Sequence, residues 1–225
     1  MQYHINTGLI YAELKKDCEC PLCSIEKIVD EQFINEYLND AVCDDDARKE
    51  VNAYGFCAEH YEKMFKRPNK LSLALQIFTR LKTVRTNAGI PKDAKSALKT
   101  SESIIASEKT CIICKTLDYA MTRYYMGIAD LFTKDPAFSD LLLNGKGFCL
   151  HHYAKLLEYA KYAGDKQKQY VAVLAQTEEK ALDRMTAELK WFCDKHDYRN
   201  RTKPLGTSQD IIPRMYKKLY GKDLT

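Results

Sequence analysis

The sequence lacks long apolar runs and has few helix-breaking residues. No run of 18 apolar residues occurs in the 225-residue chain, so no transmembrane helix is expected. The N-terminus shows no basic stretch followed by an apolar one, which excludes a secretory signal peptide. We therefore expect a cytoplasmic protein with no membrane partner. Nine glycines and six prolines are too few for a turn-rich β architecture and favour helices.

The net charge of the chain is small. There are 35 Lys and Arg against 31 Asp and Glu, a net charge of +4, which does not by itself indicate a nucleic-acid partner. Hydrophobic residues make up 45% and charged residues 29% of the chain, as in soluble globular proteins. The length suits one large domain or two small ones.

Cysteine is the residue type that the sequence has in excess. Nine cysteines in a reducing compartment do not indicate a disulfide framework, and an odd number cannot pair completely. The cysteines therefore point to metal ligands or to redox-active thiols.

Two cysteine motifs occur twice, in the same order. The segment Cys20–Cys23 (CPLC) recurs as Cys111–Cys114 (CIIC), 91 positions later. The segment 55–61 (GFCAEHY) recurs as 147–153 (GFCLHHY), 92 positions later. One inserted residue thus separates two otherwise matched repeats, and the pattern predicts an internal duplication.

The repeated motifs carry the residue types that bind zinc. CxxC supplies two thiolates from one turn, and CxxH supplies a thiolate and an imidazole from one turn of a helix. The expected metal ligands are Cys20, Cys23, Cys57, His60, Cys111, Cys114, Cys149 and His152. We expect each repeat to hold its own site, with both motifs of a site coming from the same repeat.

The sites predict two zinc ions, with two iron–sulfur clusters as the alternative, since histidine replaces cysteine in some clusters. Buried apolar cysteines or redox-active CxxC pairs are the other interpretations, but redox pairs usually follow a strand. Four protein ligands leave no open position on zinc, which favours a structural role over a catalytic one. No Ser-His-Asp set, phosphate loop or carboxylate metal triad is present, so an enzyme is not expected.

Several further residues resemble parts of a site. Cys18, Cys43 and Cys193 have no counterpart in the other repeat and are expected to be dispensable for metal binding. The segment Phe192–His196 imitates FCxxH a third time but has no accompanying CxxC, and we interpret it as chance similarity. A polar cluster ends the long C-terminal helix and forms either a helix-end salt bridge or a ligand-binding site. Its members are Lys195, Asp197, Tyr198 and Arg199.

Apolar residues recur at three- and four-residue steps, which predicts helices throughout. The expected helices cover residues 25–37, 44–53, 57–67, 71–84, 117–131, 136–144, 149–163 and 166–195, and a short last helix stops at Gly221. One of them has an apolar face of Leu71, Leu75, Phe78, Leu81 and Val84. The long helix should turn inward Leu174, Leu182, Met185, Leu189 and Phe192. No alternation typical of strands appears.

We therefore expect an all-α fold of two duplicated helical units, each built on a CxxC…CxxH metal site, followed by a long C-terminal helix. The first helical metal-binding unit should cover residues 1–91, and a linker or loose helix 92–110. The second unit should cover 111–165. Residues 166–225 should form the long helix and a basic tail that packs on the units.

The tandem CPLC…GFCxxH motifs and the WFxxKxDYRN ending resemble an uncharacterised bacterial family, found largely in anaerobes. The matching residues are Cys20, Cys23, Gly55, Phe56, Cys57, His60, Cys111, Cys114, Gly147, Phe148, Cys149, His152, Trp191, Phe192, Lys195, Asp197, Tyr198 and Arg199. Ile112 stands where the first repeat has Pro21. Members are often labelled automatically as ABC transporter substrate-binding proteins, but a solute receptor must be exported and this N-terminus offers no signal. The resemblance supports the sites and implies no activity.

Three functions remain open from the sequence. The first is a non-enzymatic, metal-stabilised module that binds a protein or a small molecule. The second is an iron–sulfur or thiol redox protein. The third is a nucleic-acid binder, because residues 199–222 carry seven Lys or Arg against one Asp, with two tyrosines among them.

Overall fold

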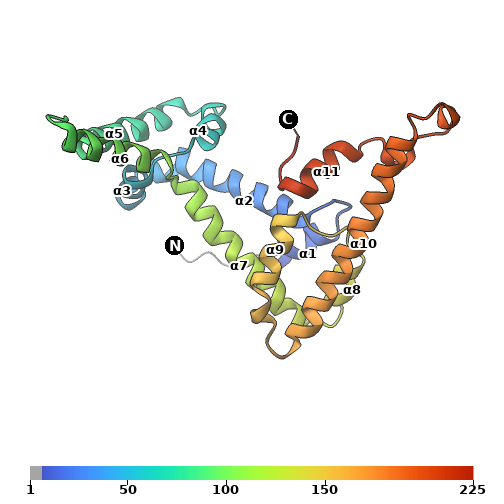
Figure 1. Cartoon of the computed structure of the whole chain (residues 1–225). Helices are drawn as coiled ribbons and strands as arrows, with labels where there is room; N and C mark the ends of the chain where they lie inside the picture. The colour runs from blue at the N-terminus through green and yellow to red at the C-terminus, as the bar shows by residue number, and fades with distance from the viewer. Residues whose placement is uncertain (1–6, 225) are drawn as a thin grey trace. The chain divides into compact units, whose positions relative to one another are not determined.

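The computed structural model describes residues 7–224, which contain eleven α-helices, four short 3₁₀ segments and no β-strand (Figure 1). The expected all-α fold is confirmed. Within this range no helix combines the length and the apolar composition needed to cross a bilayer. All nine cysteines are free thiols.

The chain forms two compact bodies. Body 1 contains the described residues up to Lys27 together with 121–224, and body 2 contains 28–120. Helices α2 (Pro21–Leu38) and α7 (Ile112–Lys134) each have residues in both bodies, because each continues for several turns beyond its CxxC motif. The bodies therefore do not follow the expected order of two successive units. Residues 92–110, the expected linker or loose helix, are mostly helix α6 of body 2.

Body 1 is built around the long helix α10. Besides parts of α2 and α7, its helices are α1 (Thr7–Leu14), α8 (Phe138–Leu143), α9 (Leu150–Glu158), α10 (Gln167–Asp194) and α11 (Ile211–Tyr220), with 3₁₀ segments at Ala160–Lys166, Tyr198–Asn200 and Gly206–Ser208. Tyr170, Leu174 and Met185 of α10 are buried, and the ring of Phe132 packs on that of Tyr170 at 5.2 Å. Leu182, expected to face inward, is 40% exposed because it lies about 80° around the helix from Leu174.

Body 2 contains a helical hairpin that leaves an apolar face uncovered. Its helices are α3 (Asp45–Tyr54), α4 (Ala58–Phe65), α5 (Lys70–Ala88) and α6 (Ala94–Glu108), with a 3₁₀ segment at Asp40–Val42. The core takes Phe33 and Ile34 from α2, Val51 from α3 and Leu73 from α5. Most of the apolar residues of α5 lie outside this core.

Local sequence explains where the helices of body 2 begin and end. The Asp44 side chain accepts hydrogen bonds from the N–H groups of Asp46 and Ala47 and caps α3. Asp93 and Ser96 form a reciprocal capping box at the start of α6. Gly55 ends α3 with a φ of 66°, a conformation that glycine adopts without steric cost, and the chain turns there towards Cys57.

Candidate metal centres

The eight expected ligands come together as two groups of four, but not in the expected combination. Site 1, in body 1, consists of Cys20, Cys23, Cys149 and His152. Site 2, in body 2, consists of Cys57, His60, Cys111 and Cys114. In each site the four ligand atoms lie within 4.8 Å of one another.

The prediction that each repeat supplies a complete site is therefore wrong. Each site combines the CxxC of one repeat with the CxxH of the other. The physical reason lies in α2 and α7, whose first turns carry the CxxC motifs and belong to a different body from the rest of the helix. A helix of this length keeps its own CxxC apart from the CxxH that follows it in sequence.

Helix N-termini present the cysteines of both sites. Cys57 and Cys149 are the N-cap residues of α4 and α9. Helices α2 and α7 begin one residue after Cys20 and Cys111. The positive end of a helix dipole favours the thiolate form of such cysteines, which is the form that binds metal.

Site 2 has the geometry of a four-ligand shell around one point. Nδ1 of His60 lies 3.2 Å from Sγ of Cys57, 3.4 Å from that of Cys111 and 3.3 Å from that of Cys114. The Sγ atoms of Cys57 and Cys114 are 3.8 Å apart. Nδ1 thus faces the thiols, and the other ring nitrogen faces away from them.

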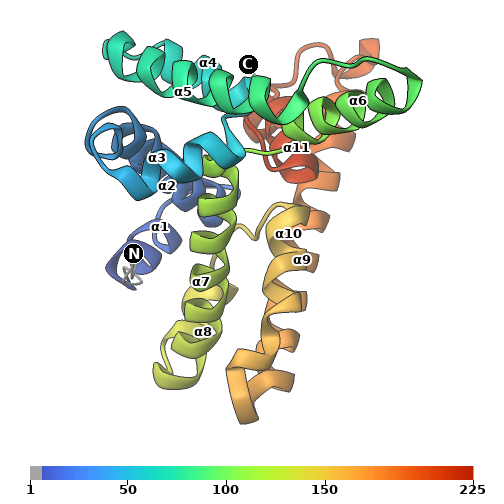
Figure 2. The same ribbon diagram turned by 90° about the vertical axis from the view of Figure 1, so that its left-hand side faces the viewer.

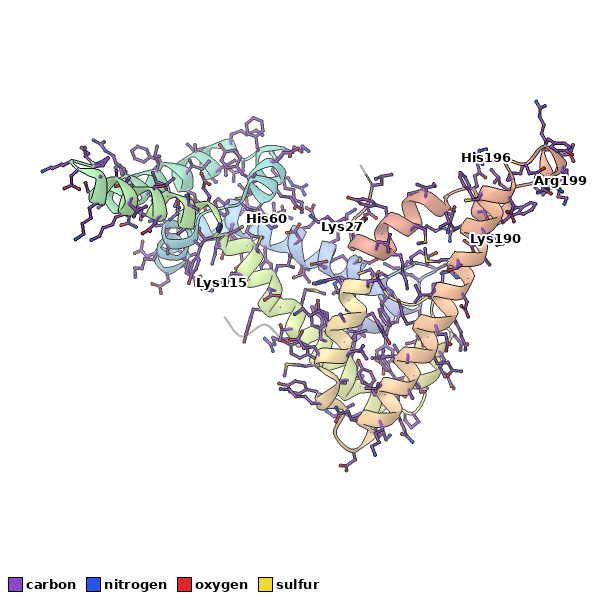
Figure 3. The ribbon with its side chains drawn as sticks, in the orientation of Figure 1. Lys27, His60, Lys115, Lys190, His196 and Arg199 are labelled. Carbon is purple, nitrogen blue, oxygen red and sulfur yellow. The ribbon has the colours of Figure 1, made fainter. Side chains whose placement is uncertain are left out.

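A buried carboxylate orients the histidine of site 2. Oδ1 of Asp30 accepts a hydrogen bond from Nε2 of His60 at 2.7 Å, and Oδ2 accepts one from Nζ of Lys63 at 2.8 Å. Carboxylate–histidine pairs of this kind fix the tautomer and orientation of metal-bound imidazoles. Figure 3 labels His60, which stands at the start of α4.

Site 1 repeats this arrangement with a looser carboxylate. Nδ1 of His152 lies 3.1 Å from Sγ of Cys149, 3.4 Å from that of Cys23 and 3.5 Å from that of Cys20. The Sγ atoms of Cys23 and Cys149 are 3.6 Å apart. Nε2 of His152 and the carboxylate of Glu26 are separated by 3.6 Å, which is longer than a hydrogen bond.

Both groups of thiols attract positive charge. Burial lowers the pKa of His60, but its hydrogen bonds with Asp30 and Cys111 outweigh burial and raise that pKa to about 10. Burial raises the pKa of Cys111, yet the His60 imidazolium outweighs it and lowers the value to about 6. Burial and the Cys111 thiolate raise the pKa of Cys114. A divalent cation among the ligands would relieve this repulsion between thiolates.

The two sites differ in exposure. The four ligands of site 1 are all buried, whereas in site 2 Cys114 is exposed and Cys57 is half-buried. The end of α11 covers site 1: the carbonyl of Gly221 accepts a hydrogen bond from the Cys23 thiol at 3.5 Å. A Cβ atom on Gly221 would lie 3.3 Å from Sγ of Cys149. Site 1 is therefore closed by the C-terminal helix, and site 2 is open on one side.

A buried ion pair holds the turn that leads into Cys149. Nζ of Lys218 lies 2.6 Å from the Glu178 carboxylate and donates a hydrogen bond to the carbonyl of Phe148 at 2.6 Å. Glu178 accepts a hydrogen bond from the N–H of Phe148 at 3.2 Å. At Gly147, with a φ of 92°, a Cβ would lie 2.7 Å from Cβ of Ala181, so only glycine fits. α10 and α11 together thus position this ligand.

The polar cluster after α10 supplies no member of either group of ligands. Nζ of Lys195 donates to the carbonyls of Asn200 and Arg201, and Asp197 pairs with Arg199 at 2.6 Å. Tyr198 is exposed. Figure 3 places Arg199 beyond the C-terminal end of α10. These contacts lie within the loop itself.

The cysteines without a counterpart are not among the eight grouped ligands. Cys18, Cys43 and Cys193 belong to neither group of ligands. His151 is exposed next to the buried His152, with ring centroids 5.3 Å apart.

The supporting carboxylates could not be recognised from the sequence alone. Asp30 lies seven residues after Cys23 on α2, yet it serves site 2. Glu26 lies three residues after the same cysteine and faces site 1. An acidic residue on a CxxC helix is a usable signal only once the crossed combination of motifs is known.

Comparisons with known proteins identify a family for this chain but no activity. A 21% identical relative over 188 residues is described as "Uncharacterized 23.9 kDa protein in xynA 3'region", from Caldicellulosiruptor sp. (strain Rt8B.4). The match covers 82% of this chain and 86% of the relative. No solved structure matches. All of residues 1–225 match the family described as "Family of unknown function (DUF6062)". The chain therefore belongs to this family.

Proposed function

We propose that the protein holds two zinc ions, one in each body, and acts as a metal-stabilised, non-enzymatic binding module. The observation that carries the proposal is the convergence of three thiols and one imidazole nitrogen in each of two places. A set of three cysteines and one histidine is a regular structural zinc shell. The carboxylate behind His60 adds the outer support that such ligands usually have.

The distances between ligand atoms support a single ion in each site. A tetrahedral zinc with Zn–S bonds of 2.3 Å separates its sulfurs by about 3.8 Å and a sulfur from a nitrogen by about 3.5 Å. One sulfur pair in each site lies close to the sulfur–sulfur value: Cys23 and Cys149 at 3.6 Å, and Cys57 and Cys114 at 3.8 Å. The sulfur–nitrogen distances run from 3.1 to 3.5 Å. An iron–sulfur cluster places several irons and sulfides between its ligands and requires a wider set of ligands.

The closed ligand shell supports a structural role. Four protein ligands leave no position for water or substrate on a tetrahedral ion. Each ion would connect the start of one long helix with the start of a short helix far away in sequence. Structural zinc contributes on the order of 10 kcal/mol in small zinc peptides, which is comparable to the whole stability of a domain.

The nucleic-acid alternative draws less support from the basic tail. Four of its seven Lys and Arg residues are already in ion pairs with acidic side chains. These are Arg199 with Asp197, Arg214 with Glu19 and Glu188, Lys217 with Asp223, and Lys218 with Glu178. A phosphate backbone would have to compete with these partners.

Metal analysis of protein purified anaerobically, under reducing conditions and without chelators, tests the proposal. We expect two zinc ions per chain and no visible absorption. Iron with acid-labile sulfide and a broad visible absorption would show that the sites hold iron–sulfur clusters instead of zinc. Iron without sulfide would indicate a mononuclear iron site. Protein that contains no metal and keeps its helicity in the presence of a strong chelator would refute the proposal.

A further inference from the structure

Body 2 contains a stretch of chain in which only one sign of charge occurs. Between residues 63 and 92 there is no Asp or Glu, although the whole chain is nearly balanced. The basic residues of this stretch are Lys63, Lys66, Arg67, Lys70, Arg80, Lys82, Arg85 and Lys92. Among the described residues, no acidic partner contacts Lys70, Lys82, Arg85 or Lys92. These four cations are exposed.

The same stretch contains an uncovered apolar face of body 2. Leu71, Leu75, Phe78 and Leu81 follow one another at steps of four, three and three residues, so they share one face of α5. Leu71 is 70%, Phe78 56% and Leu81 63% exposed. We call these four residues the α5 face. Clustered exposure of large apolar side chains marks an interaction surface.

The α5 face points away from the rest of body 2. The buried residues of α5 are Leu73 and Gln76, on the opposite side of the helix. The side chain of Gln76 donates a hydrogen bond to the backbone carbonyl of Tyr37 of α2, which fixes the rotation of α5. Helices α3, α4 and α6 contact α5, and Figure 2 shows α5 with α6 following it along the chain.

Two of these four cations, Lys70 and Lys82, lie beside exposed phenylalanine rings. Nζ of Lys70 is 4.1 Å from the ring centroid of Phe65, and Nζ of Lys82 is 4.2 Å from that of Phe78. Both phenylalanines are more than half exposed. Apolar side chains and ammonium groups therefore occur at the same level of the helix surface. This arrangement is typical of helices that lie in the plane of a membrane interface.

We propose that the α5 face, with its flanking lysines and arginine, docks on an anionic lipid surface. The acyl region would take the leucines and Phe78, and lipid phosphates would take the cations. The expectation of no membrane partner rested on the lack of a spanning segment, and a helix lying on the surface needs none. This inference goes beyond the metal sites and does not depend on which ion they hold.

Charge and shape favour lipid over the other occupants. A second copy of the chain docked through the same face would bring two basic helices together, and like charges repel. A nucleic acid would use the cations but would leave the leucines and Phe78 in water. All four residues of the α5 face lie along one helix, so a planar surface can reach them together.

Vesicle sedimentation with the full-length protein tests the proposal. We expect binding to vesicles that contain phosphatidylglycerol, weakening as salt rises, and no binding to vesicles of pure phosphatidylcholine. Phe78→Glu and Leu81→Glu should each lower partitioning by roughly tenfold, because a carboxylate would have to enter the interface. Leu98→Glu is the matched control, since Leu98 of α6 is 62% exposed and lies outside the α5 face.

Four results would overturn the proposal. The first is equal binding to both kinds of vesicle, and the second is no binding to either. The third is a Leu81→Glu variant that binds as the wild type does while keeping its helicity and metal content. The fourth is a dimer in solution that Phe78→Glu dissociates, which would assign the α5 face to a second copy.

Discussion

Replacing Asp30 by asparagine should loosen the ion in site 2 and leave site 1 unaffected. The substitution keeps the size of the side chain and one oxygen that accepts the hydrogen bond from His60. It removes the negative charge 2.7 Å from Nε2, which makes the imidazole a stronger ligand. Burial raises the pKa of Asp30, but the hydrogen bonds from His60 and Lys63 outweigh it and lower the value, so the wild-type group is ionised at neutral pH.

The size of the effect follows from this geometry. Loss of an outer-shell partner of a metal-bound histidine typically costs about 10- to 100-fold in affinity. That corresponds to roughly 1.4 to 2.7 kcal/mol. Glu26→Gln is the matched change at site 1. There the carboxylate is 3.6 Å from the imidazole and partly exposed, so we expect a loss of less than about threefold.

Competition with a coloured zinc chelator, under anaerobic and reducing conditions, measures both affinities in one titration. The wild type should show two phases, and Asp30→Asn should shift only the phase that belongs to site 2. Unchanged affinity in Asp30→Asn would show that the carboxylate does not support the ligand. An equal loss at both sites would contradict the separate assignment of Asp30 to site 2.

Three further predictions concern the pH dependence of metal binding, the exposure of site 2 and the buried ion pair of Lys218 and Glu178. At pH 7 the metal-free site 2 holds a protonated His60, whose pKa is about 10, and a thiol at Cys114, whose pKa is raised. Binding must release at least these two protons, so affinity should rise about 100-fold per pH unit near neutrality; a slope near zero would contradict this. Excess chelator should remove the ion of site 2 much faster than that of site 1, because site 2 is open on one side. Thiol-directed alkylation followed by mass spectrometry should find Cys114 modified first. Equal rates at the two sites would refute the difference in exposure. Lys218→Met should destabilise the protein by about 3–5 kcal/mol in chemical unfolding, because it leaves Glu178 buried and unpaired, and the double change with Glu178→Met should recover much of the loss.

The sequence was informative where the determinants are local. CxxC and CxxH each lie within one turn, so their ability to offer two ligands is evident from the spacing. The helix boundaries likewise follow local signals, as with Pro21 at the first position of α2 and Gly221 at the end of α11.

The combination of the motifs was not predictable in this way. The two copies of each motif offer the same ligand types at the same spacing, so a site made within one repeat and a site made across two repeats satisfy the same local pattern. What decides between them is the path of α2 and α7 through the two bodies. The roles of Asp30 and of the exposed α5 face depend on that same tertiary arrangement.

Double substitutions with metal counting test the crossed combination most directly. Cys23→Ser with Cys149→Ser disables site 1 alone, so this variant should keep one ion per chain. Cys23→Ser with Cys57→Ser disables both sites and should keep none. Ligands paired within each repeat would give the opposite result, with no ion in the first variant and one in the second.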